Sequence, residues 1–359
     1  MRTWRWTPAA LLLALDVTTA ARAGDLAITS FSGTGQLVFN TVNDGTNYDY
    51  RVEWAPSPTG PWRCFDGAAG LMQNISPVSS GSVTCSIPMC YRVVALPPHL
   101  RGMVRIPGGT NSGTDPQFGA YALTVEAFYM DRHEVTKVQW DAVYTWAVAN
   151  GYSFNYSGSG KAASHPVHTV TWYDVVKWCN ARSQKEGRPA VYTVGGAVYK
   201  TGQSDNVVQT SAAGYRLPTE VEWEYAARGG LSGRRFPWGD TINHTYANYR
   251  ANGSGMPYDT SPYTTDTFHP TYNDGADMYG LPYTASAGSF AANGYGLYDM
   301  VGNLWELCFD WYPGYEGSHR VMRGGCWYAY AYNCQVGNRF FFAPGSAGGH
   351  YGFRAVLME

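Results

Sequence analysis

Residues 215–230 read YRLPTEVEWEYAARGG. Within them, Thr219-x-x-Glu222 has the spacing of a capping box, in which each side chain bonds a free backbone N–H at the start of a helix, so a helix is predicted to begin here. Arg216 lies just before this helix, where its guanidinium can pair with Glu222 or Glu224. The block therefore predicts a structural cluster of ion pairs and caps, and not acid–base catalysis, which would need carboxylates in a perturbed environment.

Two similar signals lie upstream, Thr136-x-x-Gln139 and Thr171-x-x-Asp174, and each predicts a further helix with one apolar face. Residues 240–290 are rich in Gly, Asn, Asp, Pro, Thr and Tyr, which is typical of long ordered loops that need something to hold them. The predicted class from about residue 103 to 359 is α+β with little regular secondary structure. Short strands are predicted at 304–311, 320–327 and 352–357.

Residues 26–97 have a different character, because short alternating segments are separated by turn sequences such as Asn43-Asp44-Gly45. Strands at this spacing predict a small all-β sandwich, similar at the level of pattern to fibronectin-type modules. Pro97-Pro98 predicts a stiff linker into the second unit.

Residues 1–23 have the pattern of a signal peptide. A short positive region is followed by an apolar run, and Ala21-Arg22-Ala23 supplies the small residues that a signal peptidase reads. We expect a mature protein that begins near Gly24 and is secreted or periplasmic. Asp16 interrupts the apolar run, which is too short to cross a bilayer, so no transmembrane anchor is expected.

The composition narrows the function further. The 359 residues suffice for two domains, 45% of them are apolar, and only 14% are charged. The formal net charge is −2 and no run of Lys or Arg is present, which excludes a nucleic-acid partner. Seven cysteines include no Cys-x-x-Cys, which argues against a zinc ribbon or a thioredoxin-type site.

Several blocks between residues 103 and 359 resemble the formylglycine-generating enzyme (sulfatase-modifying factor) family. The resemblance implies the C-type-lectin-like variant fold of that family. The blocks are, in chain order, FYMDRHEVT at 128–136, HPVHTVTWYD at 165–174, the stretch 215–230, FPWG at 236–239, NGYGLYDMVGNLWE at 293–306, RGGCW at 323–327 and GFR at 352–354.

A calcium site is predicted in the block 293–306. Asp299 and Glu306 bracket a tight turn whose carbonyl oxygens can face inward, and calcium prefers carboxylate and carbonyl ligands. The resemblance implies that the side chains of Asp299 and Glu306 bind the ion together with the carbonyls of Gly302 and Leu304. The alternative is a turn held by Asx hydrogen bonds.

The resemblance implies a second calcium site at Asn248 and the carbonyl of Tyr249. Asp277 and Tyr279 are its most plausible remaining ligands. This part of the chain carries an insertion relative to the family, so Asp274 is a rival for Asp277. An Asx turn is again the alternative.

The cysteines determine whether the family's chemistry is present. Family enzymes hold copper(I) with a Cys-x4-Cys pair that follows a Gly-Gly-Ser motif, and oxygen then oxidises a cysteine of a peptide substrate. Here the Ser is Cys326 and the next cysteine is Cys334. Aligned without gaps, Cys334 takes the second catalytic position while Ala329 takes the first; a second alignment equates Cys334 with a structural cysteine.

The candidate catalytic residues are thus Cys326, Cys334 and Trp305, with the copper pair incomplete. Cys326 and Cys334 could form a displaced copper site. Other interpretations are buried thiols that act as small apolar groups, or a disulfide. The disulfide would join Cys308 to Cys326 or Cys179 to Cys334.

Two functions stay open at this stage. The missing Cys-x4-Cys favours a calcium-stabilised module that binds a protein, a peptide or a glycan on an aromatic, loop-built surface. The alternative is a copper- and oxygen-dependent oxidase, an oxidoreductase of the formylglycine-generating type that acts on a cysteine of a protein or peptide.

Overall fold

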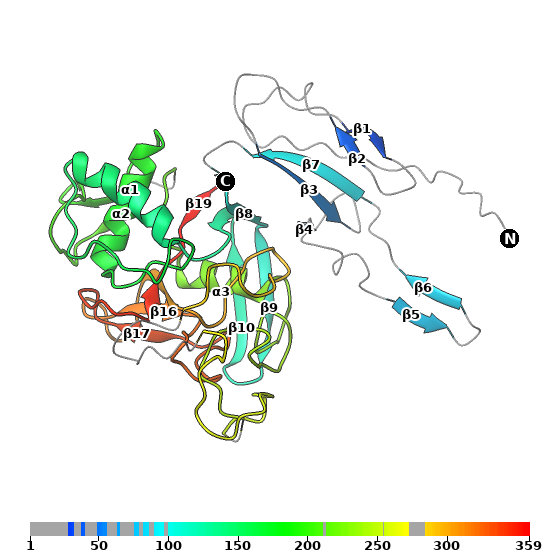
Figure 1. Cartoon of the computed structure of the whole chain (residues 1–359). Coiled ribbons are helices and arrows are strands. Elements are labelled where there is room, and N and C mark those ends of the chain that lie inside the picture. The colour runs from blue at the N-terminus through cyan, green and yellow to red at the C-terminus, as the bar shows by residue number, and fades with distance from the viewer. Residues whose placement is uncertain are drawn as a thin grey trace. The chain divides into compact units, whose positions relative to one another are not determined.

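The computed structural model describes residues 100–359 except 211–212, 254 and 273–283, together with the backbone of seven strands in the N-terminal part (Figure 1). The chain divides into two units, residues 1–101 and 102–359. The predicted signal peptide, residues 1–23, lies outside the described residues.

The strands described in the N-terminal unit pair in antiparallel fashion. The central strand β3 lies between β4 and β7, β1 pairs with β2, and β5 pairs with β6. The expected all-β character is therefore found, whereas the packing of these strands into a sandwich stays a prediction. The strands are β1 (Ile28–Phe31), β2 (Leu37–Phe39), β3 (Asp49–Ala55), β4 (Arg63–Cys64), β5 (Ile75–Val78), β6 (Ser82–Cys85) and β7 (Cys90–Leu96).

Three helices of the C-terminal unit begin where the sequence predicts. Each is preceded by a threonine whose hydroxyl accepts the third backbone N–H, with the capping box completed by the side chain at that position. The third helix ends at Gly229, which has a φ of 57° and so closes the helix in the left-handed region that glycine adopts without strain. The helices are α1 (Lys137–Ala149), α2 (Trp172–Lys185) and α3 (Glu220–Arg228).

The core gathers around α2. Trp140 of α1 stacks on Trp178 of α2 with ring centroids 5.8 Å apart, and Phe353 meets both rings edge-on. The sequence predicts one apolar face for α2, but every residue from Trp172 to Ser183 is buried. The prediction was too narrow because surrounding loops cover the polar side of this helix as well.

In the part of the unit that the structure describes, the strands form four small sheets. Strand β11 lies between β8 and the last strand, β19, so that the beginning and the end of the unit share one sheet. In the four-stranded sheet β17-β16-β15-β18, β15 pairs with β18 in parallel and with β16 antiparallel. The strands are β8 (Met103–Ile106), β9 (Gly109–Asp115), β10 (Gly119–Val125), β11 (Phe128–Asp131), β12 (Tyr192–Val194), β13 (Ala197–Val198), β14 (Val208–Gln209), β15 (Trp305–Trp311), β16 (Arg320–Arg323), β17 (Phe340–Phe342), β18 (Tyr351–Gly352) and β19 (Val356–Met358).

Two predicted strands are shorter than expected. The strand predicted at 320–327 ends at Arg323. The next two residues, Gly324 and Gly325, have φ values of 89° and 78°, whereas the residues of a β-strand have negative φ. The strand predicted at 352–357 is divided between β18 and β19, which belong to different sheets. The predicted strand at 304–311 is confirmed as β15.

The ion pairs predicted around α3 are present. Arg216 binds Glu222 with both nitrogens of its fork, at 2.7 and 2.6 Å, while Glu224 pairs with Arg228 and Arg323. Between Gly230 and Leu304 the described residues form no helix or strand, as the sequence predicts. Among the helices of the described residues, none is long and apolar enough to span a membrane.

Candidate functional site

The predicted calcium ligands Asp299 and Glu306 are buried, and the structure adds a third carboxylate, that of Glu134. Burial, reinforced by the charges of Asp299 and Glu306, raises the pKa of Glu134 well above its ordinary value. Burial also raises the pKa of Asp299, to about 6. The three acids therefore repel one another in the protein interior, where little solvent screens their charges.

Arg354 is the cation that faces this cluster. Its guanidinium is fully buried and binds Glu306 through two parallel bonds of 2.7 and 2.6 Å, while Trp223 donates to the same carboxylate at 2.7 Å. The charge of Glu306 raises the pKa of Arg354. One buried guanidinium against three carboxyl groups leaves the cluster short of positive charge whenever the acids are ionised.

Glu134 also organises the turn that carries the predicted carbonyl ligands. Its carboxylate accepts the backbone N–H of Leu304 at 3.2 Å and the side-chain amide of Asn303 at 3.0 Å. Asn303 has a φ of 63° and Gly302 a φ of 75°, so the turn is held in a left-handed conformation. In the sequence, Glu134 is only one residue of the block 128–136, with nothing to mark it as part of this site. It follows β11, and only the fold brings it to the turn that carries Asn303.

The cluster fits a hard cation in its chemistry. Oδ2 of Asp299 accepts the N–H of Gly288, whereas the buried Oδ1 has no hydrogen-bond partner among the described residues. An orphaned carboxylate oxygen is costly in a dry site and is the donor that calcium takes. Within the described part of the chain, no three His, Cys, Asp or Glu side chains converge closely enough to hold a metal, so an ion here would depend on carbonyl ligands as well.

The second predicted site is only partly described. The carbonyl of Asn248 accepts the N–H of Asn303 at 2.8 Å, and His244 lies 3.0 Å from the carbonyl of Tyr249. The loop of the second site is thus bonded directly to the turn of the first. The other predicted ligands, Asp277 and Tyr279, and the rival Asp274 lie outside the described residues.

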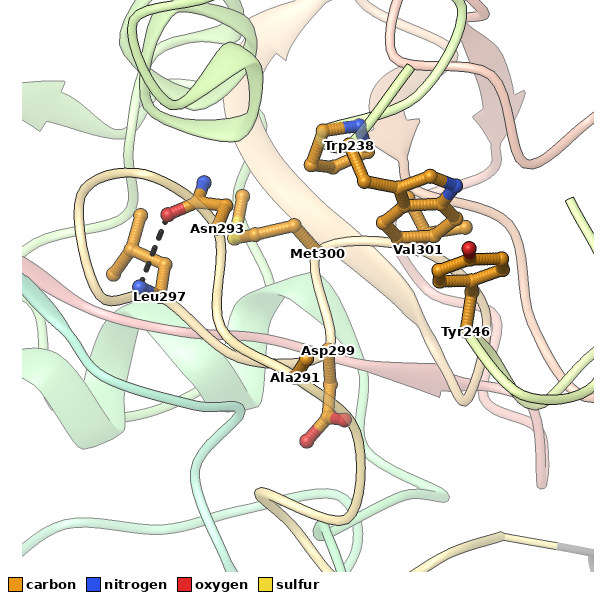
Figure 2. A pocket seen from close by; sticks show the side chains of 9 residues that line it. Trp238, Tyr246, Ala291, Asn293, Leu297, Asp299, Met300 and Val301 are labelled. Carbon is orange, nitrogen blue, oxygen red and sulfur yellow. Dashed lines mark hydrogen bonds between the residues drawn. The ribbon is translucent and has the colours of Figure 1, made fainter. Parts of the chain in front are cut away.

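A pocket lies beside the carboxylate cluster. Trp238 and Tyr246 stack at 4.9 Å on one of its walls, and Asn293, Leu297, Met300 and Val301 contribute to the rest. Figure 2 shows that the carboxylate of Asp299 points away from this aromatic pair. Asp299 itself also lines the pocket, so the pocket adjoins the predicted calcium site.

The two candidate catalytic thiols lie close together. Cys326 and Cys334 are buried, and the sulfur of Cys334 packs on Gly325, where an added Cβ would come within 2.5 Å of it. Burial raises the pKa of Cys326 to about 12, and burial together with the charge of Cys326 raises the pKa of Cys334 well above its usual range. Both are thiols at neutral pH.

All four described cysteines are free and buried, so neither predicted disulfide, Cys308 with Cys326 or Cys179 with Cys334, is present in the described structure. Cys308 lies within β15 among Asp310, Glu220 and Arg323, and Cys179 lies in α2 beside Arg182. It is their surroundings that argue against these pairings, because the groups that act on Cys308 and Cys179 include neither Cys326 nor Cys334.

Trp305 and Cys326 are each next to Tyr351, but both are buried and neither offers an open surface. Trp305 pairs with Tyr351 across the parallel strands β15 and β18, and Cys326 is close enough to raise the pKa of Tyr351, after burial as the larger cause. Phe340 covers the indole of Trp305 at 5.5 Å. Ala329, at the first catalytic position of the ungapped alignment, is also buried.

The segment between the two thiols forms a surface that we call the tyrosine loop, residues 327–333. Tyr328 is 42% exposed, and Tyr330 and Tyr332 are half-buried, whereas Ala329 and Ala331 between them are buried. The alternation places three tyrosine side chains on the outer side of the loop and two alanine side chains on its buried side.

Polar groups support this loop from a neighbouring segment. The guanidinium of Arg250 lies over the rings of Tyr328 and Tyr330, at 4.7 and 4.0 Å from their centroids. The hydroxyl of Tyr330 donates to Asp266 at 2.6 Å. An exposed aromatic surface with a cation and a carboxylate at its edge can contact a partner both by area and by charge.

Comparisons with known proteins agree with this architecture. The family model described as the sulfatase-modifying factor enzyme 1-like domain matches residues 93–358. The chain belongs to this family. The resemblance recognised from the sequence blocks is thereby confirmed.

Relatives of the chain have different named roles. The chain is 32% identical to the formylglycine-generating enzyme of Mus musculus over 293 residues, covering 72% of this chain and 75% of the relative. It is 30% identical to the chaperone protein LppX of Paenibacillus barcinonensis over 268 residues, covering 72% and 89%. Membership of the sulfatase-modifying factor family therefore does not fix one activity.

Solved structures resemble the same part of the chain. CarF superposes with a TM-score of 0.57 at 26% identity, covering 72% of this chain and 98% of that one. The Treponema denticola variable protein 1 superposes with a TM-score of 0.52 at 26% identity, covering 72% and 95%. The mixed helices and strands of the C-terminal unit are thus those of the family.

Proposed function

We propose that this chain is an exported, calcium-stabilised binding protein of the sulfatase-modifying factor family that takes a protein partner on its tyrosine loop. The C-type-lectin-like form of the family fold is part of the proposal. The observation that carries it is the alternation along the loop, with tyrosines outward and alanines inward.

Tyrosine-rich loops suit protein recognition for a physical reason. A tyrosine ring brings a large contact area with only two rotatable side-chain bonds, and its hydroxyl adapts to a polar partner. Residues 327–351 combine aromatic residues with Gly, Ser and Asn, which is the composition of protein-binding loops. Arg250 adds a guanidinium, a side chain that is enriched at interface hot spots. A glycan remains the second class of ligand.

The thiols support binding over catalysis. Copper(I) is held by thiolates, and a buried cysteine with a raised pKa resists the loss of its proton. Ala329 offers no soft ligand at the first catalytic position. One cysteine in place of a pair should hold copper(I) far more weakly.

Calcium is proposed as the ion that stabilises the loops. It would be held by Asp299 and Glu306 with the carbonyls of Gly302 and Leu304, and by Asn248 and Tyr249 with residues beyond the described part. The orphaned oxygen of Asp299 and the repulsion among buried carboxylates support this assignment. The ion supplies positive charge, and the chain supplies the oriented oxygens and excludes water.

The second candidate function is copper- and oxygen-dependent oxidation of a peptide cysteine. It is favoured by one observation, the packing of the Cys334 sulfur directly against the backbone that carries Cys326. In this case Cys326 would replace the missing ligand of the family's pair.

Binding through the tyrosine loop is tested with variants of matched exposure. Wild type, Tyr328→Ser/Tyr330→Ser, and the control Tyr156→Ser are compared for capture of secreted and cell-surface proteins and of arrayed glycans. Tyr156 is 44% exposed, close to Tyr328, but lies outside the loop. We expect a protein captured by wild type and by the control but not by the double variant. Equal capture by all three contradicts the proposal. If only glycans are captured, the ligand of the tyrosine loop is a glycan and not a protein.

Catalysis is tested by mass spectrometry of a Cys-x-Pro-x-Arg peptide incubated with protein, copper and oxygen. We expect no aldehyde to form and expect titration with copper(I) to show no tight binding. An aldehyde product that disappears in both Cys326→Ser and Cys334→Ser would establish the oxidase function instead.

A further inference from the structure

The tyrosine loop begins and ends at a cysteine. Cys326 follows the glycine pair at the end of β16, and Cys334 follows the loop directly. The N–H of Ala329 bonds the carbonyl of Cys326, and the N–H of Cys334 bonds the carbonyl of Ala331. Two consecutive turns therefore bring the ends of the loop back toward each other.

The two ends are in contact. A Cβ placed on Gly325 would lie 2.5 Å from the sulfur of Cys334 and 3.1 Å from its Cα, so only a glycine permits this approach. The backbone N–H of Cys326 is directed at the Cys334 sulfur, and Cys326 is near enough for its charge to raise the pKa of Cys334, after burial as the larger cause. Among the described cysteines, Cys179 and Cys308 are held by other elements and have polar and charged neighbours instead.

We propose that Cys326 and Cys334 form a disulfide bond that closes the tyrosine loop. Each thiol loses its proton, and the pair gives two electrons to a disulfide oxidant, either a small molecule such as oxidised glutathione or a protein disulfide. The oxidant is reduced to two thiols. In the structure the two cysteines are not bonded to each other.

The burial of both sulfurs sets when the bond forms. A buried thiol with a raised pKa exchanges slowly, since the thiolate is the attacking species. The bond therefore forms before the loop is packed, as the chain folds in an oxidising compartment, and is then protected by the same burial.

The bond would prepare the loop for binding, a consequence that rests on the proposed function. Closing seven residues, 327–333, restricts the loop before a partner arrives, so less conformational entropy is lost when the partner binds. All three tyrosines of the loop lie inside the closed ring.

Trypsin makes the bond directly observable. Cleavage after Arg323 and Arg339 releases one peptide, 324–339, that contains both cysteines, while Cys308 falls in 251–320 and Cys179 in 178–182. The full chain is refolded in a glutathione redox buffer, its free thiols are blocked with N-ethylmaleimide, and it is digested without reductant. We expect peptide 324–339 without maleimide and two hydrogen atoms lighter than its reduced form.

Each other outcome contradicts the proposal. A peptide 324–339 with two maleimide groups means that the thiols stay free, and its cross-linking to 251–320 or 178–182 means that a different pair forms. Cys308→Ser is the matched control and should leave the internal bond intact. Cys326→Ser and Cys334→Ser should each give one maleimide on this peptide. No partner enters this assay, so it can fail or succeed independently of the binding test with the tyrosine variants.

Discussion

Replacing Arg354 with methionine should destabilise the C-terminal unit by about 3–5 kcal/mol, the typical result of removing one partner from a buried ion pair. Arg354 is fully buried and makes two bonds to Glu306, two to the carbonyls of Asp131 and Arg132, and one to the carbonyl of Tyr298. Without the guanidinium, the indole of Trp223 is the only side chain among the described residues that still donates a hydrogen bond to the Glu306 carboxylate. The loss is a large part of an ordinary domain's stability of about 5–15 kcal/mol.

The assay is urea unfolding in the presence of chelator, followed by tryptophan fluorescence. With an m-value of about 3 kcal/mol/M, the midpoint should fall by about 1 M or more. The matched control is Arg105→Met, because Arg105 binds Glu359 with the same forked geometry at 2.6 and 2.7 Å while the side chains are 25% and 32% exposed. An exposed pair contributes only about 0–1 kcal/mol.

The reasoning is refuted if Arg354→Met and Arg105→Met lower the midpoint equally. A second variant separates loss of charge from loss of packing. In Arg354→Met/Glu306→Gln no unpaired charge remains, so part of the stability should return. If the double variant is no more stable than Arg354→Met, the cost comes from lost packing and not from a buried carboxylate.

The remaining predictions concern the same turn and its neighbours. Chelation should lower the melting temperature of wild type but not that of Asp299→Ala, because an ion bound only to the folded state stabilises it by mass action; an unchanged wild-type melting temperature contradicts the calcium site. In chelator, the raised pKa of Asp299, about 6 against an ordinary 3.8, means that the folded state holds more protons than the unfolded state between these values. The free energy of unfolding should therefore fall as pH rises through this window, by on the order of 3 kcal/mol, and Asp299→Asn should remove that loss. The measurement is urea unfolding of both proteins from pH 4 to 7. If the two stability curves run parallel, Asp299 is not the group that causes the pH dependence. Gly302→Ala should lower the melting temperature more than Gly288→Ala, although both positions have similar φ values of 75° and 82°. A Cβ at Gly302 would meet the carbonyl oxygen of Asn248 at 2.3 Å, whereas none of the described atoms lies within 4 Å of a Cβ at Gly288, so equal effects would show that the contact does not matter.

The helix starts were predictable because each depends on a few consecutive residues. A threonine and a side chain three positions later bond each other's backbone, and this local geometry forms wherever the chain permits it. The β9–β10 hairpin was not predicted, since Gly109–Asp115 is small and polar and shows no alternation. Its residues become a strand only through full pairing with β10.

Two members of the buried carboxylate cluster could be named from the sequence, whereas the calcium they are proposed to bind stays a prediction. Asp299 and Glu306 belong to one block, and their spacing around a turn indicated oxygen ligands. Glu134 and Arg354 lie far away in sequence and reach the cluster through β11 and the strand β18, so only the tertiary fold brings them in. The predicted disulfides failed for the same reason, because spacing along the chain does not show which thiols face each other.

One turn connects the two parts of the proposed function. Asn303 donates its N–H to the carbonyl of Asn248 and accepts the N–H of Trp327, the first residue of the tyrosine loop, while the N–H of Gly302 bonds the carbonyl of Gly324. An ion that orders the turn beside Asp299 therefore also orders Gly324, which follows β16, and Trp327, where the tyrosine loop begins. If calcium and a partner each bind better to the ordered loop, calcium must raise the affinity for the partner, and the partner must raise the affinity for calcium by the same factor. Asp299→Ala would then weaken partner binding without touching the tyrosines, which a loop independent of the turn would not show.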